Sequence, residues 1–284
     1  MPELDSKTQK INIGRIKYLN CLPYYFGWEA DALVQFESGT PAQINQMMRS
    51  GQIDAAPISS MEYLQRPEEY LLFPDLGIAS REHVRSVTLF SKKKIEDLND
   101  ASIAVTEESL TSTCLLELFL KEKLKITAKF QAMPSNPKVM LEAHDAALLI
   151  GNDALFAQPR KWIYRYDLGN LWWQWQGLPF VYAVWAVRKN SPDSGRNFYH
   201  ALKERFLYNK AHLSDCIQKQ STIGEYDRFY PKVYGYLNNL VYSLDDACWQ
   251  GLKKFAELAE VHGLCGKPDW HLLNIGSAPV AQPQ

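Results

Sequence analysis

Strands and helices alternate along the first two thirds of this sequence, and that alternation restricts the fold more than any other feature. Short apolar runs at residues 11–16, 53–58, 102–106 and 146–150 are each followed by a polar turn and a helix-forming segment. A strand followed by a helix and another strand is the repeating unit of α/β domains, whose sheets are mostly parallel. The sequence therefore predicts an α/β fold with mainly parallel sheets.

Two helices carry start and stop signals. Thr40 is a preferred N-cap residue, Pro41 fits the first turn, and Gly51 marks the end of the segment between them. Near the carboxyl end, Ser243 and Asp246 resemble a capping box in front of another helix. We expect most of the last hundred residues to be helical.

The order of these elements predicts two lobes joined by two crossings, near residues 92–101 and 176–188. The predicted first lobe comprises residues 1–95 and, after the return of the chain, the helices within 186–284. The predicted second lobe is 96–185. Ligands of open α/β sheets bind at the carboxyl ends of the strands, so two such lobes place a ligand cleft between them.

Composition and charge exclude several classes of function. The chain has 31 basic and 32 acidic residues, which gives no electrostatic footprint for nucleic acid or an anionic membrane. Neither a signal-peptide-like nor a membrane-spanning apolar run is found, so we expect a cytoplasmic protein. Five scattered cysteines and six dispersed histidines argue against disulfides and against a metal site. No glycine-rich phosphate loop follows any predicted strand, so no cofactor is expected.

The polar turn after the strand at 102–106 contains four hydroxyl residues within positions 109–113, more than one helix cap requires. Free backbone N–H groups and the dipole at a helix start bind carboxylates. We therefore predict an anion site within residues 109–113, where Ser109, Thr111, Ser112 and Thr113 supply the hydroxyls.

Other strand-end residues have two interpretations. Asn20, Ser60 and Asn152 each follow a predicted strand and are either helix caps or ligand-binding groups. Arg15 and Arg85 could balance a carboxylate. An aromatic group either lines the cleft or belongs to the core, and most of it is assigned to the core because aromatic side chains dominate core burial. Its members are Trp172, Trp173, Trp175, Phe180, Tyr182 and Trp185.

Several segments, in fixed order from about residue 11 to 190, resemble the chorismate dehydratase family of the futalosine route to menaquinone. The segments are GRIKYLNCLP, SGTPAQINQMMRSGQIDAAPISSMEY, RSVTLFS, TEESLTST, ALLIGNDAL and DLGNLWWQWQGLPFVYAVWA. The resemblance implies a type II periplasmic-binding-protein-like fold with a ligand cleft between two lobes. It also implies a hydro-lyase that needs no cofactor and converts chorismate to 3-[(1-carboxyvinyl)oxy]benzoate.

The resemblance also implies roles for individual residues. Asn20 matches the active-site asparagine of the LNxLP motif and is the predicted catalytic residue. Asn152 and Gln176 depart from the family pattern, where Asp and Thr are common. The predicted substrate-binding residues are Ser86, Ser109, Thr111, Ser112, Ser60 and Asn152.

Titratable groups are scarce in these turns, so we hypothesise that the enolpyruvyl carboxylate of the substrate itself removes the C3 proton. A side chain such as Glu107 is the competing base. Two other functions stay open: a non-catalytic protein of this fold that binds small acids, and the later naphthoate-forming step of the pathway. Chorismate is the expected partner, and the sequence allows a monomer or a homodimer.

Overall fold

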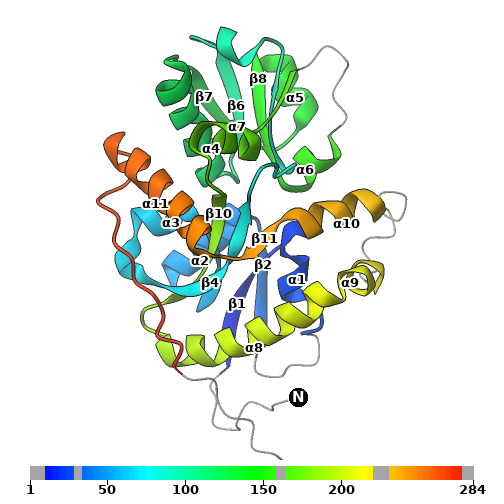
Figure 1. The fold of residues 1–284 in the computed structure, drawn as a ribbon, viewed down its shortest axis with the longest axis vertical. Helices are drawn as coiled ribbons and strands as arrows, with labels where there is room; N and C mark the ends of the chain where they lie inside the picture. Colours follow the sequence, from blue (N-terminus) through cyan, green and yellow to red (C-terminus); the bar gives the residue numbers. More distant parts are fainter. Residues whose placement is uncertain (1–9, 29–33, 158–163, 220–229, 277–284) are drawn as a thin grey trace, which may run out of the picture.

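The computed structural model describes residues 10–28, 34–157, 164–219 and 230–276, which form two lobes, each built on its own sheet (Figure 1). The first sheet has the order β11 (Val241–Ser243), β4 (Tyr70–Ser80), β10 (Phe180–Arg188), β3 (Ala55–Ser59), β1 (Ile11–Ile16), β2 (Val34–Gly39). The second has the order β7 (Lys129–Met133), β6 (Ser102–Thr106), β8 (Ala146–Ile150), β5 (Val87–Ser91), β9 (Tyr164–Asp167). The α/β class and the two lobes are as predicted.

Both sheets are mixed, so the prediction of mainly parallel sheets is wrong. β1 pairs in parallel with β2 and β3, whereas β10 runs antiparallel to both β3 and β4. In the second sheet, β6 is parallel to β7 and β8, and β5 is antiparallel to β8 and β9. Parallel pairs occur where a helix connects the strands, and antiparallel pairs occur where the chain enters or leaves a lobe.

The sheets also define where the chain crosses between the lobes. β5 belongs to the second sheet and β10 to the first, so the crossings lie between Ser80 and Val87 and between Gln176 and Phe180. The boundaries predicted from sequence, 95/96 and 185/186, would divide these strands differently.

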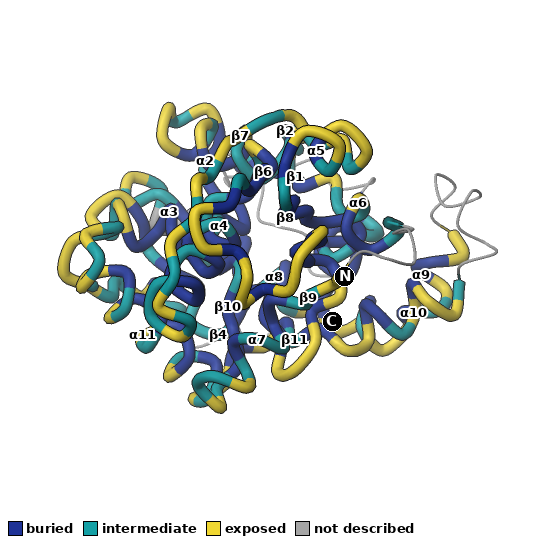
Figure 2. Tube along the Cα trace, turned by 90° about the horizontal axis from the view of Figure 1, so that it is seen from above, coloured by how far each residue is buried: buried dark blue, intermediate teal, exposed yellow. Residues whose placement is uncertain are grey.

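Helices cover the faces of both sheets. Those of the first lobe are α1 (Leu22–Tyr25), α2 (Pro41–Ser50), α3 (Ser60–Gln65), α8 (Pro192–Ala211), α9 (Leu213–Lys219), α10 (Tyr230–Asn239) and α11 (Asp246–Val261). Those of the second are α4 (Leu110–Leu118), with a π-helical extension at Phe119–Leu124, α5 (Pro137–Ala143), α6 (Gly151–Phe156) and α7 (Leu168–Gln176). Short 3-10 turns occur at Leu19–Cys21, Pro67–Glu69 and Ile95–Asp97. Figure 2 shows that buried stretches follow strands such as β4, β8 and β10, while exposed residues gather on outer turns.

The capping predictions have mixed outcomes. Thr40 caps α2 with a complete capping box, and Gly51 ends that helix in the left-handed region at φ 76°, as predicted. The cap of α11 was predicted wrongly: the carboxylate of Asp245, not the Ser243 hydroxyl, accepts the Cys248 N–H at 3.0 Å. Ser243 is instead the last residue of β11, so its backbone is committed to the sheet.

The five cysteines are all free thiols, as the sequence predicts, and four of them are buried. Within the described ranges, no three His, Cys, Asp or Glu side chains gather where they could hold a metal ion. None of the helices in those ranges combines the length and apolar character needed to cross a bilayer.

Candidate functional site

A cavity of about 640 Å³, including the part open to solvent, lies between the two lobes. It is bounded by the strand ends of both sheets, in agreement with the cleft predicted from sequence. The first lobe contributes Tyr18 and Asn20 from the segment after β1, and Tyr182 from β10. The second contributes residues 109–112 at the start of α4 and Gly151 at the start of α6.

The start of α4 is the most unusual part of the cavity wall. Ser109 is its N-cap residue, yet no side chain caps the helix, and the buried Ser109 hydroxyl has no hydrogen-bond partner. Within the described part of the chain, the backbone N–H groups of residues 110–112 make no hydrogen bonds. Unpaired donors in a buried position are costly unless a ligand satisfies them. This helix start therefore offers a group of free donors and a positive dipole end to the cavity.

Two other predicted binding residues line the cavity, and each has a hydroxyl proton that is still free to donate. The Ser86 hydroxyl oxygen accepts from the Tyr236 phenol at 2.8 Å, and the Thr111 oxygen accepts from the Met61 N–H at 3.1 Å. Burial raises the pKa of Tyr236, so its phenol remains the donor. Because each hydroxyl is already an acceptor, its own proton is free to point at a ligand. Ser112, which is also buried, lies beside Thr111 on the same wall.

Asn20 lies in the 3-10 turn after β1, where the sequence allowed either a helix cap or a ligand-binding group. It makes no cap bond, and its buried side-chain oxygen has no partner. A buried amide oxygen without a donor is rare in folded proteins. The capping interpretation of Asn20 is therefore wrong, and the residue offers a hydrogen-bond acceptor to the cavity.

Ser60 and Asn152 are not among the residues that line the cavity. Ser60 is fully buried and donates to the Val181 carbonyl at 2.7 Å, while the neighbouring Ser59 lines the cavity and caps α3. The Asn152 side chain accepts from the Leu19 N–H at 3.3 Å and so connects the two lobes. Both predicted binding residues have structural partners, which the sequence could not reveal.

The wall of the cavity contains no Lys, Arg or His among the described residues. Arg15 instead stacks on the Tyr25 ring at 5.7 Å, and Arg85 is exposed. Glu107 is also exposed and outside the wall, whereas the adjacent Glu108 lines it and accepts a hydrogen bond from the Tyr18 phenol. The cavity is therefore rich in neutral donors and has one acidic residue.

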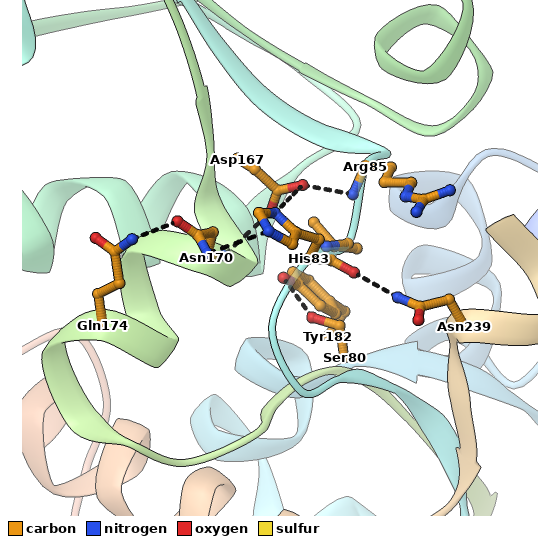
Figure 3. Close-up of polar contacts among 9 residues, drawn as sticks. Ser80, His83, Arg85, Asp167, Asn170, Gln174, Tyr182 and Asn239 are labelled. Atoms are coloured by element: carbon orange, nitrogen blue, oxygen red, sulfur yellow. Dashed lines mark hydrogen bonds and ion pairs between the residues drawn. The ribbon is translucent and has the colours of Figure 1, made fainter. Parts of the chain in front are cut away.

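The first crossing, between Ser80 and Val87, is held to the second lobe by Asp167, which the sequence did not single out. Its carboxylate accepts from the backbone N–H groups of Val84 at 3.1 Å and Arg85 at 2.6 Å, and it also caps α7. Figure 3 shows the Arg85 guanidinium directed away from Asp167. Tyr182, assigned to the aromatic core from sequence, contacts Ser80 beside this junction and faces the cavity.

The relationship to known proteins agrees with this geometry. Residues 11–261 match the sequence profile of the family described as menaquinone biosynthesis. The chain belongs to the menaquinone biosynthesis family. The family match covers both lobes, including the helices that return to the first lobe after β10.

Individual relatives specify the similarity further. The chain is 30% identical over 262 residues to the chorismate dehydratase of Thermus thermophilus, covering 86% of this chain and 93% of that protein. A crystal structure of a protein from Archaeoglobus fulgidus superposes with a TM-score of 0.74 at 19% identity, covering 90% and 98% of the two chains. The periplasmic aliphatic sulphonate-binding protein of Escherichia coli superposes with a TM-score of 0.66 at 12% identity, covering 100% and 96%. The predicted periplasmic-binding-protein-like fold is therefore confirmed.

Proposed function

We propose that this member of the menaquinone biosynthesis family is a chorismate dehydratase, which removes water from chorismate to give 3-[(1-carboxyvinyl)oxy]benzoate. The observation that carries the proposal is the uncapped start of α4, whose free N–H groups and unpartnered Ser109 hydroxyl face the cavity between the lobes. Chorismate has two carboxylates, and such a helix start binds one of them. The Thermus thermophilus relative supports the same activity.

The donors around the cavity divide between the functional groups of chorismate. Ser109, Thr111 and Ser112, with the N–H groups beside them, hold one carboxylate, and Ser86 donates to the second. Asn20 presents its amide oxygen, which is an acceptor. We therefore assign to Asn20 the ring hydroxyl at C4, which is a hydrogen-bond donor before it leaves.

The proposed reaction needs one base and one departing hydroxyl. The enolpyruvyl carboxylate of the bound substrate takes the C3 proton, and the C3–H electron pair becomes a ring double bond. The C4–O bond breaks, and its electron pair leaves with oxygen, which takes up the proton that the enolpyruvyl carboxylate removed, so that water forms and the carboxylate is regenerated. Aromatisation of the ring drives the elimination, and the cavity contributes orientation and neutral hydrogen bonds.

The nature of the wall supports a substrate carboxylate as the base. The competing base, Glu107, is exposed and does not line the cavity. Among the described residues the wall has no cationic side chain, so dipoles and hydroxyls are the groups there that neutralise the two carboxylates. A carboxylate held by neutral donors keeps more of its basicity than one paired with Arg or Lys.

The decisive experiment is to incubate the pure protein with chorismate, without added metal or cofactor, and to analyse the products by mass spectrometry. We expect a product lighter than chorismate by one water, formed with multiple turnovers and unaffected by a chelator. Tight binding of chorismate without a new product would favour the binding-protein alternative. A cytoplasmic location and a monomeric or homodimeric state are part of this proposal, and fractionation and light scattering test them.

A further inference from the structure

One contact across the mouth of the cavity has no part in the reaction described above. The phenol of Tyr18, in the segment after β1 of the first lobe, donates a hydrogen bond to the carboxylate of Glu108, in the turn before α4 of the second lobe. Both residues line the cavity, and Glu108 is the one Asp or Glu among its described lining residues. Burial and the contact with Glu108 raise the pKa of Tyr18, so the phenol remains the donor at neutral pH.

The Tyr18 ring is itself fixed against the second lobe. It lies over Gly151, the first residue of α6, so closely that a Cβ atom at position 151 would come within 2.8–2.9 Å of three ring atoms. Gly151 also has a positive φ of 59°, which other residues adopt at a cost. The glycine therefore makes room for the ring, and the ring brings the phenol to Glu108.

Leu19, the residue after Tyr18, also bonds to the second lobe. The Leu19 N–H donates to the Asn152 side chain at 3.3 Å, so two consecutive residues of the first lobe bond to the second. Asn20 follows immediately, and its side-chain oxygen has no protein partner. The attachment of residues 18 and 19 to the second lobe therefore helps to set the position of Asn20 at the cavity.

We propose that Tyr18 and Glu108 are a positioning pair, which holds the segment 18–20 against the second lobe so that Asn20 meets a substrate bound at α4. The inference rests on the proposed function and adds two residues that act through Asn20. The pair also explains why the Glu108 carboxylate is compatible with a site that binds a dianion, because that carboxylate accepts a hydrogen bond from the Tyr18 phenol. A misplacement of about 1 Å in a catalytic group costs up to about 10²-fold in rate.

Four variants test the pair. Tyr18→Phe keeps the ring over Gly151 and removes only the donor, so we expect kcat to fall by about 10- to 100-fold while KM changes less than about threefold. Glu108→Ala should have a similar effect, whereas Glu108→Gln, which retains an acceptor oxygen, should recover most of that loss. The double variant Tyr18→Phe with Glu108→Ala should be no slower than either single variant, because both remove one interaction. The matched control is the exposed neighbour, Glu107→Gln, which should equal the wild type.

A second measurement is independent of turnover. Small-angle X-ray scattering of the unliganded protein should give a larger radius of gyration for Tyr18→Phe than for the wild type, because the lobes lose a contact. If wild-type protein forms no product from chorismate, the proposed function fails, while scattering still tests the pair. If Tyr18→Phe had the kcat, the KM and the radius of gyration of the wild type, the proposal of a positioning pair would be overturned. Glu108→Gln as inactive as Glu108→Ala would also overturn it, because the carboxylate would then be needed for its proton or charge.

Discussion

Helices α2 and α4 are each the first helix after a strand, α2 after β2 and α4 after β6, but their first turns are completed in different ways. At α2, the Thr40 hydroxyl accepts from the Gln43 N–H at 3.4 Å and the Gln43 side chain accepts from the Thr40 N–H at 2.9 Å. At α4, the Ser109 hydroxyl is buried and unpartnered, and no side chain caps the helix. Since hydroxyl residues suitable for capping are present at both, the difference indicates that the donors of α4 are kept for a ligand.

The largest expected effect concerns the acceptor that faces those donors across the cavity. Asn20→Ala should lower kcat by about 10²- to 10³-fold, because it removes the acceptor that orients the C4 hydroxyl of the substrate for elimination. Its fold should be unchanged, since the Asn20 oxygen has no protein partner to lose. Product formation measured by mass spectrometry, with circular dichroism and thermal melting as controls, checks both statements. Near-normal turnover would remove Asn20 from the mechanism.

The next effect tests the open helix start directly. Ser109→Ala should reduce kcat/KM by about 10- to 100-fold, the loss expected when one hydrogen bond to a charged group is removed. The melting temperature should stay the same or rise, because the substitution deletes a buried hydroxyl that has no partner in the free protein. A lower melting temperature with unchanged kinetics would show that Ser109 is structural, as Thr40 is in α2.

Much of the fold could be predicted because its signals are local. β1, β6 and β8 have the bounds expected from their apolar runs, and α2 begins and ends at its predicted caps. β4 escaped prediction because Pro74 and Gly77 interrupt its sequence. Its pairing with β10 shifts register between Leu72 and Gly77, so the irregular residues lie where the ladder is already broken.

The site was predictable to the extent that it follows strand ends. Asn20, Ser86 and the residues of the α4 start do reach one cavity. Ser60, in contrast, is identical in type to its neighbour Ser59. Ser59 ends β3 and caps α3, whereas Ser60 is the first residue of the helix, and this one-residue step decides which hydroxyl faces the cavity. Glu108 was overlooked because it directly follows the exposed Glu107, and the sequence does not show which of the two adjacent carboxylates lines the cavity.

A smaller effect is expected at the capped helix. Thr40→Ala should destabilise the protein by about 1 kcal/mol, the usual cost of losing an N-cap, and lower the melting temperature by about 2–4 °C. Activity should be unchanged, because Thr40 does not line the cavity. Differential scanning calorimetry and steady-state kinetics on the same preparation measure the two quantities. A kinetic defect as large as that of Ser109→Ala would abolish the contrast between the two helices.

The smallest expected effect concerns Asp145, at the start of β6. Because β6 leads into α4, this prediction compares the two ends of that strand. At its start, Asp145 accepts from the Ser102 N–H at 2.9 Å and pairs with Lys93 at 2.9 Å. These contacts, the Ser102 N–H first, lower the pKa of Asp145 from 3.8 to about 2. The charged carboxylate therefore stabilises the fold above about pH 4, and this contribution is lost as the pH falls toward about 2.

Asp145→Asn should accordingly lower the free energy of unfolding by about 1 kcal/mol at pH 7, a value reduced by the partial exposure of the ion pair. The difference from the wild type should shrink between pH 4 and pH 2, where the wild-type carboxyl takes up its proton. Urea unfolding at pH 6 and pH 3 measures that change. Turnover at pH 7 should be normal, since this end of β6 is stabilised by the protein itself and only the other end is left open to the substrate. If the difference in free energy of unfolding between the wild type and Asp145→Asn did not depend on pH, the contribution of Asp145 would not be electrostatic.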